Sequence, residues 1–430
     1  MHIAFVDSNP VGLNALLAAK RRGHEVTFVS SKQFVEFLGD LSAIEARGLA
    51  DRIVRIDASR DEDELFAALS ELNRKHPLDA VVTVLEYCAS SVARCAQRLG
   101  LAGTDPAALS LAQNKAACRD RISASGLRSV GHFVVDTLEL ALVRAAHIGY
   151  PVIAKPLSGG GSILAEKIDN EDRLRAYFAS LGKQLALPAG LLDAISPQTL
   201  LEDYIDGPLL SVEVAAAAGE VVPLIVSARK RCIDEPAIEL GTTMPAPVSS
   251  EVADALRAYA VEVVRSVGLD FGIFHIELIL SEHGPVLVEA NPRIMGGNMP
   301  TVFKLATDID AYDLLVDMYL TRAMPVACRD IVPIQAATTR MIGAAESTQV
   351  EKAIAPHWNA PFKERLAGWR FDVSRGTRVA KMDSSTCPFH FQVVGASAHE
   401  SSLLAEWIIG QTARATGIKL RSSSEDYLFR

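Results

Sequence analysis

The segment from residue 272 to residue 297 constrains the fold of this chain more than any other part. Two apolar-rich runs flank residues 281 to 284, and this pattern is typical of a β-hairpin. Residues 277 and 289 are equidistant from His283, so a hairpin folded about His283 places Glu277 directly opposite Glu289. The sequence therefore predicts two carboxylates that face each other across neighbouring strands.

Opposed carboxylates predict a cation between them. Like charges opposite each other on one sheet face repel at Cβ separations of roughly 4.5 to 5.5 Å. Side chains alternate between faces, so His275 and Asn291 are expected beside the two acids, whereas the opposite face carries Phe274, Ile276, Leu278 and Leu280. Oxygen ligands without a nearby thiolate suit Mg²⁺ or Mn²⁺ better than zinc. The alternative is a solvent-facing hairpin whose acids never meet.

Composition limits the class of protein. A length of 430 residues favours two to four structural units over one core. The net charge of −9 and the absence of a Lys/Arg-rich block argue against a nucleic-acid partner. The sequence has no long apolar run, and no basic region precedes the first apolar residues, so neither a membrane span nor a signal peptide is predicted. Six scattered cysteines predict free thiols in a reducing cytoplasm and argue against structural zinc.

The first 110 residues alternate strand and helix patterns. Expected strands cover 3–6, 25–29, 53–56 and 80–84, and expected helices lie near 12–22, 62–74 and 88–99. This alternation predicts an α/β domain with a parallel sheet. Ligands bind at the carboxyl edge of such sheets, which makes residues 7–12, Glu86 and Tyr87 candidates. Residues 8–12 lack the glycine spacing of a nicotinamide site. Glu86 is either a substrate contact or an exposed residue at a helix start.

A glycine-rich loop follows a strand that ends in lysine. The strand at 151–155 ends at Lys155, and before a second strand at 163–167 come Ser158, Gly159, Gly160, Gly161 and Ser162. Consecutive glycines allow the backbone N–H groups to approach a ligand closely, and the lysine supplies positive charge. The segment thus predicts a polyphosphate site, although a glycine-rich loop on its own is commonly only a turn.

An apolar strand that breaks is the next candidate site. It contains Glu202, Asp203, Tyr204 and Ile205, breaks at Gly207-Pro208 and resumes over residues 209–216. A strand that ends in a connector leaves free backbone groups that can bind an adenine edge, and Glu202 could accept a hydrogen bond from the exocyclic amine. The alternative is an ordinary interdomain strand.

The remaining elements suggest four parts. Helix patterns occur on both sides of a strand at 132–135, at 249–267 and within 300–321, a strand is expected at 222–226, and the last hundred residues contain strands at 335–341 and 389–394 and a helix at 400–416. The predicted division is an N-terminal domain at 1–112, linker helices and a lid at 113–206, a catalytic part at 207–325 and a closing subdomain at 326–430.

The chain resembles the ATP-grasp superfamily over about residues 1–325. Its motifs have the order and spacing of that superfamily: Lys115, Lys155 with its glycine loop, Glu202, and the hairpin residues Glu277, Glu289, Asn291 and Arg293. The most specific part runs from residue 289 to residue 297. Together with His275-Ile-Glu277, the Asn-Pro-Arg-x-x-Gly-Gly sequence is similar to L-amino acid ligases that make dipeptides. This resemblance implies a Rossmann-like N-terminal domain, a lid subdomain and a C-terminal antiparallel sheet.

The resemblance also implies ligand contacts. It assigns Lys115 and Lys155 to the α- and β-phosphates of ATP, and Glu202 with the following backbone to adenine. Two Mg²⁺ ions would be held by Glu277, Glu289 and Asn291, with Arg293 beside the γ-phosphate. Many relatives have a ribose-binding glutamate where this chain has Leu209, so the ribose contact is expected from Glu213 or elsewhere.

The expected activity is an ATP-dependent carboxylate–amine ligase that works through an acyl phosphate. Gly296 and Gly297 could present N–H groups to the acid substrate. His275 either binds or deprotonates the amine, or is a structural imidazole that Asn291 satisfies across the hairpin. Arg229 either meets a substrate carboxylate or is solvated. The resemblance favours a homodimer.

Two other functions remain open at this point. The first is an ATP-grasp carboxylase or a purine-biosynthesis type of ligase, which would use bicarbonate or a phosphorylated amine. The second is a nucleotide-binding protein without catalysis, although an arginine at the γ-phosphate is not needed for binding alone.

Overall fold

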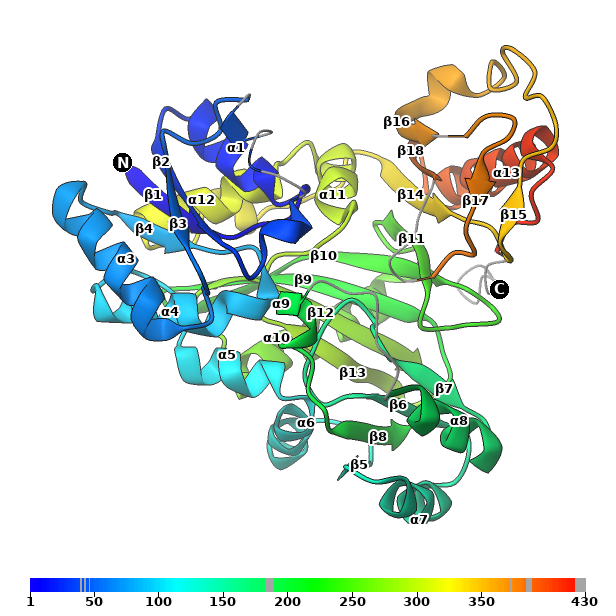
Figure 1. The fold of residues 1–430 in the computed structure, drawn as a ribbon, viewed down its shortest axis with the longest axis horizontal. Helices are drawn as coiled ribbons and strands as arrows, with labels where there is room; N and C mark the ends of the chain where they lie inside the picture. The colour runs from blue at the N-terminus through cyan, green and yellow to red at the C-terminus, as the bar shows by residue number, and fades with distance from the viewer. Residues whose placement is uncertain are drawn as a thin grey trace.

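Three large β-sheets organise the chain (Figure 1). The computed structural model describes residues 1–38, 41, 44–45, 47–181, 189–371, 373–383 and 389–421. Within this part, a four-stranded parallel sheet, a four-stranded antiparallel sheet and an eight-stranded antiparallel sheet follow one another along the sequence. The mixed α/β class expected from the sequence is confirmed.

The parallel sheet belongs to the N-terminal domain. Its strand order is β3-β2-β1-β4, with bounds Arg52–Ile56, Glu25–Ser31, His2–Val6 and Ala80–Val82. The helices between and after these strands are α1 (Leu13–Arg21), α3 (Glu62–Lys75) and α4 (Ala89–Arg98). Ile3 and Phe5 pack in one core, and Ala4 and Val6 pack in another. Both faces of β1 are thus covered, which explains its continuous apolar sequence.

Two capped helices connect this domain to the second sheet. They are α5 (Pro106–Gln113) and α6 (Lys115–Ala124). The Asp105 side chain accepts a hydrogen bond from the N–H of Ala107, and the Asn114 side chain accepts one from the N–H of Ala117. Such caps satisfy N–H groups that have no partner within the helix. The cap at Asn114 makes Lys115 the first residue of α6.

The second sheet forms a lid subdomain at the lower right of Figure 1. Its strand order is β5-β8-β6-β7, with bounds His132–Val135, Thr199–Asp203, Val152–Pro156 and Glu166–Ile168. The helices of this part are α7 (Leu138–Ile148), α8 (Glu171–Leu181) and the short α9 (Ala189–Leu192). Leu201, Val152 and Ile168 lie in its core. The strand expected at 163–167 begins only at Glu166, because residues 161–164 form a turn.

The eight-stranded sheet spans the centre of the molecule. Its order is β13-β12-β9-β10-β11-β14-β18-β16, and the bounds in that order are Gly284–Asn291, Gly272–Ser281, Leu209–Ala217, Glu220–Arg231, Glu239–Met244, Ala336–Ile342, Phe389–Gly395 and Leu366–Phe371. Helix α10 (Ser250–Val267) packs on one face through Leu256, Ala260 and Val264. The sequence did not predict β11 or β16.

The remaining helices attach the sheet to its neighbours. Helix α11 (Met299–Thr307) and helix α12 (Ala311–Thr321) share a core with α1 of the N-terminal domain. Helix α13 (Ala398–Thr416) packs on the C-terminal strands, and β15 (Thr348–Gln349) pairs with β17 (Arg378–Val379). Because β14, β18 and β16 continue the central sheet, the sheet crosses the boundary predicted between residues 325 and 326.

The cysteines of the described part form no disulfide bonds. Five cysteines there are buried free thiols: Cys88, Cys95, Cys118, Cys232 and Cys328. Cys387 lies outside the described residues. Across the described ranges, no helix has both the length and the apolar character that a membrane crossing requires.

Candidate functional site

The hairpin brings the two acids together as predicted, but its turn is shorter than expected and a β-bulge restores their pairing. Glu277 pairs with Glu289 and His275 pairs with Asn291, as expected. The turn, however, has two residues, because Ser281 pairs with Gly284. The register then shifts by one residue after Glu277, and Val288 is the extra residue of a β-bulge. The bulge is essential, since the two-residue turn alone would place Glu277 opposite Val288.

Basic side chains surround the two acids. The Lys115 Nζ atom lies 2.8 Å from Glu289 Oε1, and Arg229 Nη1 lies 3.6 Å from Glu277 Oε1. Burial alone raises the pKa of Glu277, but the hydrogen bond from His275 and the charges of Arg229 and Arg293 lower it to about 2. Glu277 is therefore ionised at neutral pH.

The donor set fits a magnesium ion that shares its shell with a phosphate. Glu277, Glu289 and Asn291 line the same cleft, and the Asn291 Nδ2 atom is buried without a hydrogen-bond partner. An unpaired buried polar atom commonly indicates a missing partner. This one is an N–H donor, which suits a phosphate oxygen, so Oδ1 is the Asn291 atom that would bind the metal. Among the described residues, no group of three His, Cys, Asp or Glu side chains could hold a metal. Two carboxylates and an amide do suit Mg²⁺, which usually completes its shell with phosphate and water.

Helix α6 connects the hairpin to the lid. Lys115 and Arg119 are four residues apart and lie on one face of the helix. Arg119 is 2% exposed; its Nε donates to Glu202 Oε1 at 2.9 Å, and its Nη2 donates to the carbonyl of Val288 at 2.6 Å. One guanidinium thus binds the bulge residue and the lid carboxylate. Sequence reasoning missed Arg119, and its only signal was the spacing of four residues from Lys115.

Glu202 holds the lid lysine in place. Its Oε2 atom lies 2.7 Å from Lys155 Nζ, while Oε1 receives Arg119. Burial raises the pKa of Glu202, but Arg119 and Lys155 together lower it to about 2. Both carboxylate oxygens are therefore engaged by cations. The expected contact between this side chain and adenine remains a prediction, and any such contact must share these oxygens.

The glycine loop lies against the N-terminal domain. The Gly159 carbonyl accepts a hydrogen bond from Lys115 Nζ at 2.9 Å, and the Ser158 carbonyl accepts one from the N–H of Ser196. A Cβ atom on Gly160 would lie 3.3 Å from Glu86 Oε2 and from the Tyr87 hydroxyl. The lid therefore reaches the N-terminal domain at Gly160, where a side chain would crowd Glu86 and Tyr87.

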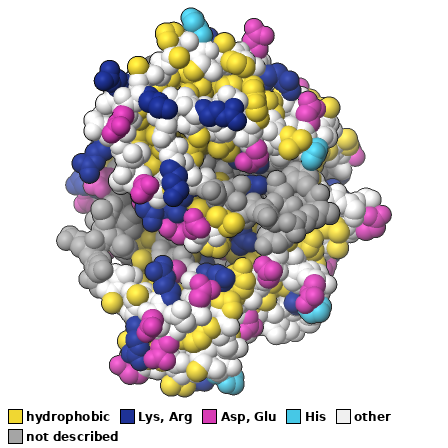
Figure 2. Space-filling model, turned by 90° about the vertical axis from the view of Figure 1, so that its right-hand side faces the viewer, with side chains coloured by type: hydrophobic (Ala, Val, Ile, Leu, Met, Phe, Trp, Pro, Cys, Tyr) yellow, Lys and Arg dark blue, Asp and Glu magenta, His cyan; other side chains and the backbone are white. Residues whose placement is uncertain are grey.

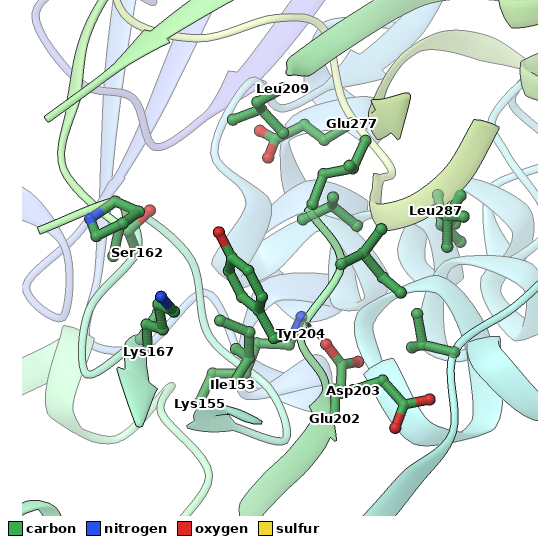
Figure 3. Close-up of a pocket in the computed structure, with 18 of the residues that line it drawn as sticks. Ile153, Lys155, Ser162, Lys167, Glu202, Asp203, Tyr204, Leu209, Glu277 and Leu287 are labelled. Carbon is green, nitrogen blue, oxygen red and sulfur yellow. Dashed lines mark ion pairs between the residues drawn. The ribbon is translucent and has the colours of Figure 1, made fainter. Parts of the chain in front are cut away.

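An apolar pocket lies between the lid and the hairpin. It contains about 870 Å³ of empty space. The expected adenine residues Glu202, Asp203, Tyr204 and Ile205 line one side, while its apolar walls include Val130, Ile153, Leu209, Ile279, Val286 and Leu287. Tyr204 points into the pocket between Ser162 and Lys167 on one side and Leu287 on the other (Figure 3). A flat, largely apolar ring fits such a space.

A smaller cavity joins this pocket to the hairpin acids. It has about 460 Å³ of empty space and is lined by Lys115, Lys155, Gly159, Gly160, Ser162, Glu277 and Glu289. Lysines, glycine N–H groups and opposed acids therefore meet in one place, as the polyphosphate prediction requires. Ser162 lies at the junction because it also lines both neighbouring cavities.

A wider cleft, which we call the substrate cleft, extends from the hairpin across the central sheet. It has about 1240 Å³ of empty space and is lined by Gly161, Ser162, Arg229, Ala237, Glu239, Gly241, Thr242, His275, Glu277, Glu289, Asn291, Arg293, Gly296, Gly297, Asn298, Met299, Thr339, Met341, Met382 and Asp383. Seen from the right of Figure 1, the molecule is hollowed between an upper and a lower part, with basic and acidic side chains close together around the hollow (Figure 2).

Arg293 connects the hairpin to the N-terminal domain. Its Nε lies 3.2 Å from Glu86 Oε2, and its Nη1 donates to the carbonyl of Ile294. Burial raises the pKa of Glu86, and the Arg293 charge partly offsets this effect. Glu86 is 8% exposed, so the alternative of an exposed helix start is wrong. A Cβ on Gly296 would approach Arg293 Nη1 to 3.3 Å, so a side chain there would require a small shift of the guanidinium.

His275 lies beneath the cleft and has acidic partners on both sides. Its Nδ1 is 2.5 Å from Glu213 Oε1, and its Nε2 is 3.1 Å from Glu277 Oε1. Burial lowers the pKa of His275, but Glu213 and Glu277 raise it to about 9. The expected partner Asn291 is wrong, because β9 runs beside β12 and pairs Glu213 with His275. Arg229 Nη1 also lies 2.8 Å from Nε2. A protonated His275 ring would repel this guanidinium, so this contact opposes the effect of the two carboxylates.

Two further expectations need correction. Glu213 is fully buried and lines none of the three cavities described above, so the predicted ribose or substrate contact is wrong. Arg229 is not solvated, because its side chain is only 8% exposed and pairs with Glu239. It does line the substrate cleft, which leaves the substrate-binding alternative as a prediction.

Models of two related domains match the sequence. An ATP-grasp N-terminal domain matches residues 16–103, and an ATP-grasp domain matches residues 148–302. Together they include three of the four strands of the parallel sheet, the glycine loop, three of the four strands of the lid and the hairpin. The region between them contains Lys115 and Arg119.

Several curated proteins are similar in sequence. The uncharacterized protein y4rH of Sinorhizobium fredii is 28% identical over 60% of this chain and 52% of its own length. Carnosine synthase 1 of Gallus gallus is 29% identical over 59% of the chain but only 28% of its own length. Alanine–anticapsin ligase of Bacillus subtilis is 24% identical over 72% of the chain and 67% of its own length. The first two matches thus span about half or less of those relatives.

Solved structures show the same fold at lower sequence identity. The L-amino acid ligase of Bacillus licheniformis superposes with a TM-score of 0.76 at 20% identity, covering 96% of this chain and 97% of the ligase. The biotin carboxylase domain dimer of Hydrogenobacter thermophilus 2-oxoglutarate carboxylase, in complex with MgADP, ADP and bicarbonate, superposes with a TM-score of 0.65 at 17% identity, covering 98% and 91%.

Proposed function

Because the chain belongs to the ATP-grasp superfamily, we propose that it is an ATP-dependent carboxylate–amine ligase that joins two amino acids or similar compounds. The observation that carries this proposal is the opposition of Glu277 and Glu289 at the junction of an apolar pocket beside the lid and a larger cleft that contains Arg293. Relatives named as alanine–anticapsin ligase and carnosine synthase support the choice of amino-acid substrates.

The nucleotide is proposed to bind between the lid and the hairpin. Adenine would occupy the apolar pocket beside Tyr204, and the phosphates would extend under the glycine loop toward Lys115 and Lys155. Lys155 is held by Glu202, and Lys115 is held by Glu289 and by the Gly159 carbonyl. Both cations are therefore positioned before a ligand arrives, which reduces the entropy lost on binding.

Glu277, Glu289 and Asn291 are the residues that would hold Mg²⁺. When bound, magnesium neutralises charge on the transferring phosphoryl group and orients it. We propose that two ions bind, and Mn²⁺ can replace Mg²⁺ because it prefers the same oxygen ligands. Arg229 and His275 hold the Glu277 carboxylate from behind, so this ligand has a fixed orientation.

Arg293 is proposed to stabilise negative charge as the acid substrate is activated. The substrate carboxylate attacks the γ-phosphorus of ATP, the bond to the β-phosphate oxygen breaks, and an acyl phosphate and ADP form. The guanidinium can pair with phosphoryl oxygens at this step and with the oxyanion of the following tetrahedral intermediate. Gly296 and Gly297 line the same cleft, where their N–H groups could bind the acid.

The second step forms the amide bond. The amine nitrogen attacks the acyl carbon, phosphate leaves, and the nitrogen loses a proton. Geometry favours a positioning role for His275 over a role as the base, because both ring nitrogens contact carboxylates and the residue is only 2% exposed. Its proposed task is to fix Glu277 in the orientation that metal binding requires.

The test is product formation from ATP with single amino acids, paired amino acids, or bicarbonate plus an amine. We expect ADP and phosphate release to be greatest with a pair, and mass spectrometry to detect a dipeptide. Release that requires bicarbonate would favour the carboxylase alternative. Mg-ATP binding without turnover in any mixture would favour a protein that only binds nucleotide.

Two variants connect this activity to the site. Arg293→Ala and Glu289→Gln should each lower turnover by at least a hundredfold, since charge stabilisation at such centres is worth several kcal/mol. Circular dichroism should remain unchanged. Full turnover in both variants would end the proposal.

The assembly is a separate proposal. We propose a homodimer, in keeping with the resemblance to the superfamily and with the dimeric biotin carboxylase domain that shares the fold. Light scattering coupled to size-exclusion chromatography measures the molar mass directly, and a value near 46.2 kDa, the mass of one chain, would contradict it.

A further inference from the structure

The substrate cleft continues across the central sheet into the C-terminal subdomain. Arg229 of β10 pairs with Thr242 of β11, and Thr242 pairs with Thr339 of β14. All three residues line the cleft. They form one row across the sheet, because directly paired residues point to the same face. The floor of the cleft therefore runs from the hairpin acids to residues beyond position 326.

The length of this floor exceeds the needs of one substrate. Four strand spacings separate β12, which carries Glu277, from β14, which carries Met341. At about 4.8 Å per spacing, the distance across the sheet is roughly 19 Å. An extended residue spans only about 3.5 Å. The acid must lie beside Arg293 for phosphoryl transfer, so the far end of the cleft is left for the amine substrate.

The far end has a distinct chemical character. Met341 and Met382 line it and pack with Cys232, Ile238 and Leu240. Unbranched thioether side chains adapt to different apolar shapes. Charged groups dominate the opposite end, where Glu277, Glu289 and Arg293 lie. The cleft thus changes from charged at the hairpin to largely apolar around the two methionines, apart from Asp383, which also lines it.

The backbone fixes Met382 at this position. Its N–H donates to the Ala344 carbonyl at 2.9 Å, and its carbonyl accepts a hydrogen bond from Arg421 Nη2 at 2.8 Å. A Cβ on Gly343 would lie only 2.4 Å from the Met382 Cβ. The glycine, which directly follows β14, therefore allows the chain at Met382 to approach the end of this strand closely. Met341 and Met382 consequently pack in the same hydrophobic cluster.

We propose that Met341 and Met382 bind the apolar side chain of the amine substrate, so that the C-terminal subdomain selects the second amino acid. This inference rests on the proposed ligase activity and adds the chemical class of one substrate. It predicts an amine substrate such as methionine or leucine in preference to aspartate or glycine, and a product that carries this residue at its carboxyl end.

The kinetic test holds the acid substrate constant and varies the amine through glycine, alanine, leucine, methionine and aspartate. Each buried methylene should raise kcat/KM about fourfold. Met382→Ala and Met341→Ala should lower kcat/KM for methionine at least tenfold through KM of the amine, with KM of ATP unchanged. Met324→Ala is the matched control, because Met324 is also buried but lies in another core.

A binding measurement separates this inference from the ligase proposal. Calorimetry with a non-hydrolysable ATP analogue and Mg²⁺ should show methionine binding that weakens at least tenfold in both cleft variants but not in Met324→Ala. This result supports the apolar site even if no peptide forms. Equal binding by all variants, a preference for aspartate, or a dipeptide with the apolar residue only at its amino end would overturn the inference while leaving the ligase activity intact.

Discussion

Replacing Arg119 tests whether one buried side chain couples the lid to the metal hairpin. In Arg119→Leu, Glu202 keeps Lys155 but loses its second cation, and the Val288 carbonyl loses its donor. Removing one partner of a buried ion pair costs about 3 to 5 kcal/mol, and an unsatisfied buried carbonyl costs about 1 to 3 kcal/mol. Because Lys155 remains, we expect a loss near the lower end, about 4 kcal/mol in total.

The assay is urea unfolding followed by circular dichroism, together with binding of a fluorescent ATP analogue with and without Mg²⁺. Arg121→Leu is the matched control: it lies on the same helix, is exposed, and donates only a 3.3 Å hydrogen bond to Ser266. The control should change the free energy of unfolding by at most about 0.5 kcal/mol. Arg119→Lys should recover only part of the loss, because a single ammonium lacks the forked geometry that reaches both acceptors.

The bulge at Val288 determines which change in nucleotide binding is expected. If Arg119 holds Val288 so that Glu289 faces Glu277, the variant should bind nucleotide with Mg²⁺ at least tenfold more weakly, with a smaller effect when Mg²⁺ is absent. Stability within 1 kcal/mol of the wild type, combined with unchanged Mg-nucleotide affinity, would refute the reasoning.

Two further perturbations address Glu202 in the lid and Gly207 in the connector between β8 and β9. The folded-state pKa of Glu202 is lowered to about 2 from 4.5, so its contribution of about 3 kcal/mol is present above pH 4.5 and is lost as the pH falls toward 2. The stability difference between wild type and Glu202→Gln, measured by urea unfolding, should narrow over that range, and a constant difference would contradict the assignment. Gly207→Ala should cost at least about 3 kcal/mol, since its φ is +144° and a Cβ would lie 2.2 Å from the Leu280 carbonyl. Gly219→Ala, with a φ of +82° but open space around it, should cost only about 1 kcal/mol by thermal unfolding, and equal losses at both positions would exclude the close contact as the cause.

The hairpin shows how far the sequence alone could predict the site. Strand alternation correctly placed His275, Glu277, Glu289 and Asn291 on one face, because side-chain period is a local property of a strand. The predicted turn was one residue too long, and the bulge at Val288 compensated for that error. The bulge residue accepts a hydrogen bond from Arg119, which is 169 positions away in the sequence, and such a distant partner leaves no signal within the hairpin.

Errors arose where strands that are distant in sequence become neighbours. Glu213 was expected at the ribose, yet β9 lies between β12 and β10 and buries its carboxylate against His275. The same sheet order brings Met341 to the cleft that contains Glu277. Neither adjacency follows from local patterns, because strand order in an antiparallel sheet is set by packing of the whole domain. Lys155 and the glycine loop, which line one cavity, were easier to place together, since they are close in sequence.

The most direct test of the central claim is Mn²⁺ binding, measured by the electron paramagnetic resonance of free Mn²⁺ in the presence of a non-hydrolysable ATP analogue. Glu277→Gln and Glu289→Gln should each weaken Mn²⁺ binding at least tenfold, because each removes one of two charged ligands. Glu282→Gln, in the exposed turn of the same hairpin with a side chain 84% exposed, should leave the affinity unchanged. Wild-type Mn²⁺ affinity in both Glu277→Gln and Glu289→Gln would show that these two carboxylates do not bind the metal.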